Sequence, residues 1–339
     1  MNELSFANGY ALLIGVGADL PATVRDARAL RELLVDPHVA AYPSDQVILL
    51  DEQKASRAGI LGAFDELLDK ARGNPDAVVI IYYSGHGMKY RDDDGTWRYC
   101  LVPYGYAPET PDETTLSGAE FTRCIEALQP KKLLVLLDCC HAGGVTKARG
   151  PGMQAAPIPE ELIAYLSRGS GRVVIASSKE NELSYVERDG VHSVFTACLL
   201  DVLRGQGVKQ EDGYVRLFDV MGHLLDEVPR RAAAQHPLIK EVRDLDDNFP
   251  LCYYSGGANA KLQARPAATS GAAYRSERMR GMFQAEWNLL HEKVLFLKRR
   301  LLLSTRADEK FALEVQITEE MTKLGELERK LTELEQGKV

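Results

Sequence analysis

Five short segments in the first 254 residues are almost continuously apolar. They are YALLIGV (10–16), QVILL (46–50), AVVIIYYS (77–84), KLLVLLD (132–138) and RVVIAS (172–177). A strand that is buried on both faces shows such a run, whereas a half-exposed strand alternates apolar and polar residues. We therefore predict five buried strands.

Amphipathic segments of helical length separate these strands. We expect helices near 24–35, 56–71, 117–128 and 193–204. Ser117 with Glu120 forms an S-x-x-E capping box at the start of the third helix. Because strands and helices alternate, the pattern predicts an α/β fold with a mostly parallel sheet flanked by helices on both faces. Residues 91–103, which contain DDDG, predict a hairpin inserted after the third strand.

The pattern changes near residue 255. A small, polar stretch rich in Gly, Ala and Pro predicts a linker over 255–275. Beyond it, apolar residues recur every three or four positions, as on one face of a helix. They are Met279, Phe283, Trp287, Leu290, Val294, Leu297 and Leu301, and then Leu313, Ile317, Met321, Leu324, Leu327, Leu331 and Leu334. With a break at 304–308, they predict a C-terminal α-helical hairpin over 276–339, after a domain of residues 1–254.

The two helices of this hairpin carry opposite charges. The first is rich in Lys and Arg, and the second is rich in Glu. We expect these charges to pair within the hairpin. The alternative is a helical partner that binds residues 276–335.

Charge and composition limit the classes of binding partner and the cellular compartment that we expect. The net charge of −8 argues against general binding to nucleic acid or to an anionic membrane. The N-terminus lacks a signal-peptide pattern, and no apolar run approaches the roughly 18 residues that a membrane span needs. Six cysteines are too few for a disulfide framework in 339 residues. We therefore expect a cytoplasmic protein, with no nucleic-acid or membrane partner, whose thiols stay reduced.

Two of the predicted strands lead into residues that carry chemistry. The third runs into YSGHG (83–87), and the fourth runs into DCCHAGG (138–144). A cysteine acts as a nucleophile when it is ionised, and a nearby imidazole accepts its proton. Cys140 lies 54 residues after His86 (140 − 86), close to the roughly 50-residue interval of caspase-type enzymes. The two motifs predict nucleophilic catalysis at the carboxyl ends of the strands.

YYSGHG and LLDCCHAGG resemble the histidine and cysteine motifs of bacterial metacaspases, which belong to the caspase-like cysteine peptidases. The resemblance spans about residues 8–253 and implies the caspase-haemoglobinase fold. It also implies a Cys–His dyad with no obligatory third member, with Cys140 as nucleophile, His86 as base and Cys139 in a slot that is usually serine. The backbone N–H groups of Gly87 and Cys140 would form the oxyanion hole.

The resemblance also implies an acidic S1 pocket that accepts Arg or Lys. Asp138, two residues before the nucleophile, and Asp26, at the start of the first helix, match the two aspartates of that pocket. Ser84 matches a serine that lines it, and Thr23 stands where a cysteine is common. Two carboxylates facing a guanidinium form charge-assisted hydrogen bonds. Substrates would therefore be proteins cleaved after a basic residue.

No cofactor or metal is expected, with calcium left as an alternative. Many metacaspases bind calcium through aspartates, but this chain has Gly105 and Lys147 in the corresponding segments. A zinc site built from Cys139, Cys140, His141 and His86 lacks the usual C-x₂-C spacing.

The segment after the nucleophile predicts a processing site. Residues 145–162 are rich in Gly, Pro and Ala and have no periodic apolar pattern, so we expect an exposed loop. Lys147 and Arg149 within it are basic residues of the kind the enzyme itself would accept. We expect cleavage there by the enzyme or by an upstream activating protease.

The C-terminal helices resemble the small effector-associated domains that bacteria attach to proteases of conflict systems. This resemblance implies a regulated protease in an antiviral defence or programmed cell-death pathway. The main alternative is a catalytically silent adaptor that acts through its C-terminal helices. A third is a transpeptidase, or a relative specific for Asn or Asp.

Overall fold

The computed structural model describes residues 5–92, 94–139, 154–156, 158–168, 171–239, 248–254 and 307–335, together with Val294 and Leu301. The chain forms two compact units. The first comprises Met1–Pro229 with Gln235–Gln263, and the second comprises Arg230–Ala234 with Ala264–Val339.

The first unit is built on a sheet whose strands lie in the order β10-β8-β6-β3-β1-β2. The parallel strands are β1 (Gly9–Gly15), β2 (Val47–Asp51), β3 (Val78–Arg91), β6 (Lys132–Cys139) and β8 (Arg172–Ala176). β10 (Leu238–Ile239) runs antiparallel at one edge. All five predicted strands are present, and the predicted parallel sheet is confirmed.

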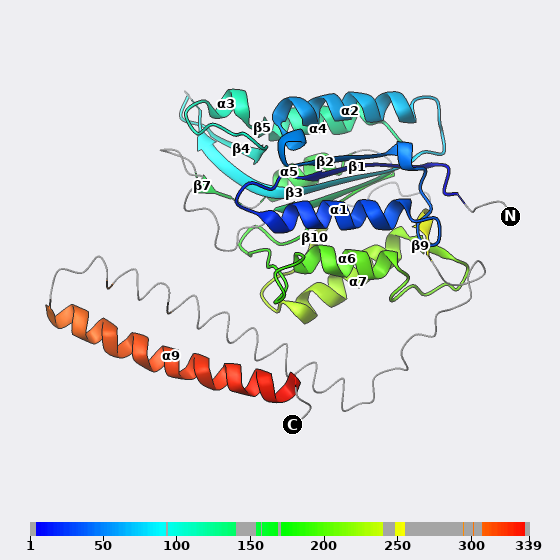
Figure 1. The fold of residues 1–339 in the computed structure, drawn as a ribbon. Helices are drawn as coiled ribbons and strands as arrows, with labels where there is room; N and C mark the ends of the chain where they lie inside the picture. Colours follow the sequence, from blue (N-terminus) through cyan, green and yellow to red (C-terminus); the bar gives the residue numbers. More distant parts are fainter. Residues whose placement is uncertain are drawn as a thin grey trace. The chain divides into compact units, whose positions relative to one another are not determined.

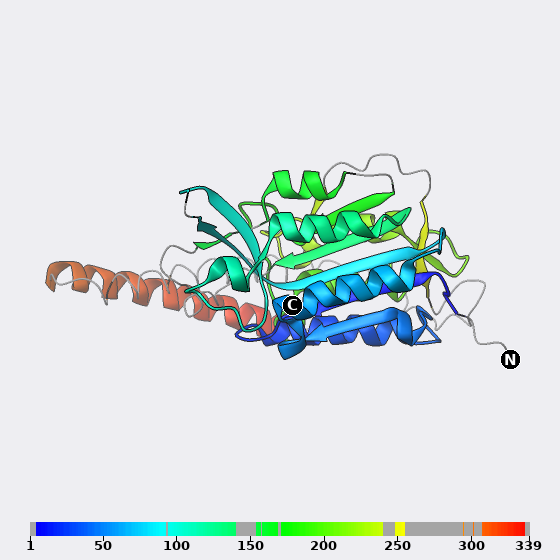
Figure 2. The ribbon, with the colours of Figure 1, turned by 90° about the horizontal axis from the view of Figure 1, so that it is seen from above.

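Helices cover both faces of this sheet. α2 (Arg57–Ala71), α4 (Gly118–Leu128) and α5 (Glu160–Leu166) lie on one face, which Figure 2 shows from above. α1 (Pro21–Val35), α6 (Val194–Leu203) and α7 (Leu217–Arg231) lie on the other (Figure 1). The four predicted helices correspond to α1, α2, α4 and α6, whereas α5 and α7 were not predicted. Shorter elements are η1 (Ser44–Gln46), η2 (Glu52–Ala55), α3 (Pro111–Thr114) and the pair β9 (Tyr214–Arg216) with β11 (Pro250–Tyr253).

Strand residues alternate between the two faces. Val79, Ile81 and Tyr83 belong to the core cluster on the side of α2, α4 and α5. Tyr82 and Ser84 therefore point to the opposite face, the side of α1 and α6. On β6, Cys139 belongs to the same core cluster as Tyr83, so the preceding residue, Asp138, points to the α1–α6 side. Most polar groups of the candidate site thus lie on the α1–α6 face.

β3 is longer than predicted. It pairs in parallel with β1 up to Ser84 and with β6 up to Gly85, and from His86 to Arg91 it pairs antiparallel with β4 (Trp97–Val102). The predicted hairpin is confirmed, but its first arm begins within β3. His86 therefore lies where the strand changes partners and not at the end of a strand. β5 (Leu116–Ser117) pairs with β4, and β7 (Gln154–Ala155) pairs with β3.

The expectation of an exposed loop over 145–162 is wrong for the described part of that segment. β7 adds to the edge of β3, the side chains of Ala156 and Ile158 are buried, and α5 begins at Glu160. The sequence did not reveal this burial, because Ala156 and Ile158 are too few to form a periodic apolar pattern. Lys147 and Arg149 lie outside the described residues.

The second unit contains α9 (Ala307–Glu335). Leu313, Ile317, Leu324 and Leu327 on its predicted stripe are buried, and Leu301 packs against Leu313 and Ile317. The second helix of the predicted hairpin is therefore present. The first lies outside the described residues except for Val294 and Leu301, so the hairpin itself stays a prediction. In the described part of the chain, every helix is too short or too polar to cross a membrane.

Candidate active site

The predicted site residues that the structure describes include several at the carboxyl edge of the parallel sheet. Gly15 of β1 is the partner of Ser84 in β3, and Ser84 is the partner of Asp138 in β6. The next pair along the two strands joins Gly85 to Cys139. Cys140 directly follows Cys139 in the sequence but lies outside the described residues, as do Lys147 and Arg149.

His86 is a buried imidazole whose backbone is fixed on both sides. Its residue exposure is 6%. The Tyr83 hydroxyl shares its one hydrogen between the carbonyl oxygens of His86 (3.1 Å) and of Val102 on β4 (3.1 Å). The Nε2 atom lies 2.9 Å from Oδ1 of Asp19, in the loop that follows β1. Asp19 was not predicted; a polar residue just after a buried strand, at the edge where sites collect, was the available signal.

Both glycines that flank His86 are required by close packing. A Cβ atom on Gly87 would lie 2.2 Å from Oη of Tyr99 and 2.8 Å from the carbonyl oxygen of Ala156. One on Gly85 would lie 2.7 Å from Oη of Tyr83. The Gly87 carbonyl accepts from the N–H of Ala156 (3.1 Å), which fixes this peptide between β4 and β7. The oxyanion role of Gly87 stays a prediction.

Cys139 is a buried and neutral thiol. It is 3% exposed, the Tyr99 hydroxyl donates to its sulfur at 3.8 Å, and burial raises the pKa of Cys139 to about 12. At neutral pH this side chain therefore holds almost no thiolate.

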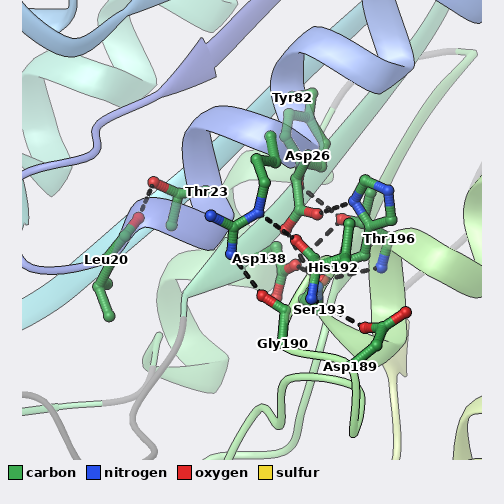
Figure 3. A network of polar contacts seen from close by, with 12 residues as sticks. Leu20, Thr23, Asp26, Tyr82, Asp138, Asp189, Gly190, His192, Ser193 and Thr196 are labelled. Atoms are coloured by element: carbon green, nitrogen blue, oxygen red, sulfur yellow. Dashed lines mark hydrogen bonds and ion pairs between the residues drawn. The ribbon is translucent and has the colours of Figure 1, made fainter.

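Asp138 is fully buried and accepts several hydroxyl donors (Figure 3). Ser184 Oγ donates to Oδ1 (2.9 Å), while Ser193 Oγ and Thr196 Oγ1 (3.2 Å) donate to Oδ2. Burial raises the pKa of Asp138, whereas hydrogen bonds from these hydroxyls and from Ser177 oppose the rise.

Asp26 is also fully buried, and it pairs with a histidine. Nδ1 of His192 lies 2.7 Å from Oδ1, and the N–H of Ser193 donates to Oδ2 (3.2 Å). Burial is the largest cause that raises the pKa of Asp26 to about 6; the His192 hydrogen bond opposes it, and the nearby charge of Asp138 adds to it. The same hydrogen bond raises the pKa of His192, which is partly exposed.

Ser193 links the two carboxylates. Its N–H donates to Asp26, and its hydroxyl donates to Asp138. The same Oγ atom caps α6, because it accepts from the N–H of Thr196 (2.9 Å). The positive end of the α6 dipole therefore lies against the carboxylates and helps to stabilise their ionised forms.

The loop that carries His192 is tied to α1. Val186 and Ser193 form a β-bridge that closes the loop. Arg25, next to Asp26 in α1, donates from Nε to the carbonyl of Val191 (2.8 Å) and from its second terminal nitrogen to that of Gly190.

The remaining two predicted S1 residues differ in their contacts. Ser84 is fully buried, and among the residues that the structure describes its hydroxyl makes no hydrogen bond of normal geometry, although its interaction with the Tyr82 hydroxyl opposes the rise that burial causes in the pKa of Tyr82. Thr23 is buried, but its hydroxyl is used by the loop after β1: it accepts from the N–H of Gly17 (2.8 Å) and donates to the carbonyl of Leu20 (2.8 Å). The pocket roles of both stay predictions.

The expectations about metal binding stay predictions. Within the described ranges, no three His, Cys, Asp or Glu side chains converge as a metal site would require. The Asp92 carboxylate of the DDDG turn accepts hydrogen bonds from Nε of Arg98 (2.6 Å) and from the N–H of Thr96 (2.8 Å). The hydrogen bond from Arg98 lowers the pKa of Asp92. Gly105 has φ +76°, which favours glycine.

Comparison with known proteins identifies the family. Residues 8–249 match the family described as "Caspase domain". Metacaspase-1A of Neurospora crassa is 29% identical over 148 residues, which are 40% of this chain and 32% of that protein. Metacaspase-1 of Yarrowia lipolytica is 30% identical over 149 residues, 39% of this chain and 31% of that protein. The chain thus spans about a third of the length of these relatives.

A solved structure titled "structure of pro-sf-caspase-1" is 15% identical, with a TM-score of 0.39, and the match covers 71% of this chain and 89% of that one. The resemblance of the C-terminal helices to effector-associated domains stays a prediction. The caspase-domain match covers well over half of the chain and includes both the histidine and the cysteine motifs. The chain therefore belongs to the caspase-domain family of cysteine peptidases.

Proposed function

We propose that the chain is a cysteine endopeptidase that cleaves after Arg or Lys, with Cys140 as nucleophile and His86 as base. One observation carries the proposal. A buried imidazole and a buried pair of carboxylates, Asp26 and Asp138, meet at the sheet edge where β6 leads into Cys140.

The register of β3 and β6 supports the pairing of His86 with Cys140. Cys139 is the partner of Gly85, one residue before His86. Cys140 directly follows Cys139 in the sequence, and we therefore propose that it acts at the same edge of the sheet. The buried neutral thiol of Cys139 leaves Cys140 as the nucleophile of the cysteine pair.

In the proposed reaction, the Cys140 thiolate attacks the carbonyl carbon of the scissile bond. The oxyanion is held by backbone N–H groups, with Gly87 and Cys140 as the donors. His86 protonates the leaving amine as the C–N bond breaks and the acyl-enzyme forms. His86 then takes a proton from water, which attacks the thioester and releases the acid and the thiol.

Counting hydrogen-bond acceptors assigns different roles to the two carboxylates. An ionised carboxylate has about four lone-pair sites. Ser184, Ser193, Thr196 and Ser177 take up those of Asp138. Asp26 accepts from His192 and from the N–H of Ser193, which leaves two sites. We therefore assign direct contact with the P1 cation to Asp26, and the shaping of the pocket to Asp138.

Ser84 adds a further group to this recognition site. Ser84 is the strand partner of Asp138, and its buried hydroxyl makes no hydrogen bond of normal geometry among the described residues, so it can accept from a P1 donor. An arginine can use Asp26 and Ser84 at once through its planar fork, whereas a lysine offers one ammonium. We expect Arg to be cleaved faster than Lys.

The proposal extends to regulation. Lys147 and Arg149 are the proposed processing sites, cut by the enzyme itself or by an upstream protease of like specificity. Residues 276–335 are the proposed recruitment module for a helical partner, in a bacterial defence or cell-death pathway. No cofactor is assigned, and calcium remains the alternative.

Covalent capture tests the proposal. A peptidyl acyloxymethyl ketone with Arg at P1 should alkylate the full-length chain, and peptide mapping by mass spectrometry should find one adduct, on Cys140. The matched reagent with Asp at P1 should leave the chain unmodified. An adduct on Cys139, or equal labelling by both reagents, would remove the assignment. The Cys140→Ala variant controls for labelling elsewhere.

A further inference from the structure

The side chain of Asp19 contacts His86 from the loop that follows β1. Its Oδ1 atom lies 2.9 Å from Nε2 of His86. Asp19 lies in the loop after β1, and His86 lies in β3 where that strand changes partners, so the pair connects two adjacent strands of the sheet. In the part of the chain that the structure describes, no Lys or Arg forms an ion pair with Asp19.

The loop that carries Asp19 has an unusual and well-braced backbone. Gly17 and Ala18 both have positive φ, at +74° and +57°, and the second of these is uncommon for a residue with a side chain. The N–H of Leu20 donates to the carbonyl of Gly17 (3.0 Å), which closes a tight turn around Asp19. Non-glycine residues in such conformations collect at functional sites, where the surrounding structure over-determines them.

Three hydrogen bonds tie this turn to its surroundings. The N–H of Val16 donates to the carbonyl of Ser84 on β3 (3.0 Å). The Thr23 hydroxyl accepts from Gly17 and donates to Leu20, so it spans both ends of the turn. Asp19 is therefore presented to His86 by a fixed element, with Thr23 as its brace.

The contact decides which ring nitrogen of His86 is available. An ionised carboxylate accepts hydrogen bonds and cannot donate one, so Nε2 must carry the proton in the Asp19 contact. In the neutral imidazole, Nδ1 then keeps its lone pair. A base must point that nitrogen at the nucleophile.

We propose that Asp19 is a positioning residue that fixes the orientation and tautomer of His86, so that Nδ1 serves the nucleophile. The inference rests on the proposed function and adds a third member to the expected Cys–His dyad. Asp19 touches no reacting atom and acts only through the imidazole.

Kinetics of four full-length variants test the inference. Asp19→Asn and Asp19→Ala should lower kcat for an Arg-P1 peptide at least about tenfold, which is part of the roughly 10²–10⁴-fold that general acid–base catalysis contributes, with KM within about twofold. Asp19→Glu should recover part of the loss. Asp51→Asn is the matched control, because Asp51 ends the adjacent strand β2 at the same edge but binds Arg28 (2.8 Å). It should keep wild-type kcat.

Imidazole ¹⁵N spectra provide a readout that does not depend on turnover. With His86 assigned by its loss in His86→Gln, wild type should show the Nε2–H tautomer, and Asp19→Ala should show mixed tautomers. Wild-type kcat in Asp19→Asn, an unchanged tautomer in Asp19→Ala, or an equal loss of kcat in Asp51→Asn would each overturn the inference. If wild type cleaves no peptide but Asp19→Ala still changes the tautomer, the contact stands and the peptidase assignment fails.

Discussion

At the scale of single residues, the two buried carboxylates of the site differ in the donors that they already accept. Asp138 accepts hydrogen bonds from several side-chain hydroxyls, whereas Asp26 accepts from a histidine and from one backbone N–H. A buried carboxylate that has all its acceptor sites filled serves the fold, and one with sites left over can serve a ligand. Substitution should therefore separate the two aspartates.

Asp26→Asn should lose most Arg-P1 cleavage, because a buried guanidinium would lack its charged partner. Such a loss is on the order of 2–5 kcal/mol in transition-state free energy. Asp138→Asn should instead lower the free energy of unfolding more than Asp26→Asn does, because its amide places a donor against hydroxyl donors. Measurements of kcat/KM and urea denaturation of both variants check this. Equal activity losses with equal stabilities would contradict the division of roles.

The titration of Asp26 predicts a pH dependence for binding a basic ligand. The pKa of Asp26 is raised to about 6, so its charge is present above that pH and is lost as the pH falls through it. In the Cys140→Ala background, the affinity for benzamidine should therefore weaken about tenfold for each pH unit well below 6. Calorimetry measures this without turnover, and Asp26→Asn should bind weakly at every pH. A flat profile in the parent would place the cation elsewhere.

The same raised pKa has the opposite consequence for folding. The native state holds a proton on Asp26 that the unfolded chain has already released between about pH 4 and 6. The contribution of Asp26 to stability therefore falls as the pH rises through that window. His192 acts in the same direction, because its raised pKa gives stability that is present below its unfolded value and lost as the pH rises through the folded one.

At the scale of elements, the apolar runs predict the strands well because burial on both faces leaves an unbroken pattern. The capping box is also present: Ser117 Oγ accepts from the N–H of Glu120 (3.2 Å), and Glu120 accepts from the N–H of Ser117 (3.1 Å). The continuation of β3 could not be predicted, because a change from parallel to antiparallel partners leaves no local pattern.

Other elements were predictable but missed. In α7, Leu217, Val220, Leu224 and Val228 are buried at spacings of three and four, which is a helical stripe. The contacts of the site are a different case. Asp19 and His192 lie 67 and 166 residues from the groups they bind, so only the tertiary structure reveals them.

Close packing at the partner switch of β3 predicts a contrast between two glycines. Gly87→Ala should force Tyr99 or the Ala156 peptide to move, with a cost of about 1–3 kcal/mol and a loss of kcat. Gly62→Ala, in the exposed middle of α2, meets no atom within 4 Å and should stabilise the fold by about 0.5–1 kcal/mol at unchanged activity. Thermal unfolding and peptide assays compare the two. A Gly87→Ala enzyme with full kcat would show that the peptide is not held as tightly as this packing indicates.

At the scale of the whole molecule, the polar network of the site belongs to the first compact unit. Asp19, Asp26, His86, Asp138 and His192 all lie within Met1–Pro229, whereas α9 belongs to the second unit. The proposed active-site residues and the C-terminal helix therefore belong to different compact units of the chain.

A chain ending at Gln263 should cleave a short Arg-P1 peptide with kcat/KM within about threefold of the full-length chain. The reason is that truncation removes no described residue of the site. The assay is paired with size-exclusion chromatography, and a full-length sample of equal concentration is the control. If the truncated chain forms aggregates, the second unit completes the fold of the first, and a recruitment role is wrong.

The central claim is that Cys140 cleaves after a basic residue that Asp26 recognises. Its most direct test is a set of fluorogenic peptides that differ only at P1 (Arg, Lys, Asn or Asp), offered to wild type, Cys140→Ala and Cys139→Ala. Wild type should cleave Arg best, then Lys, and neither of the others. Cys140→Ala should cleave none, and Cys139→Ala should keep much of the activity, because the Cys139 thiol is buried and neutral. Cleavage after Asp or Asn, or equal losses in the two cysteine variants, would contradict the account.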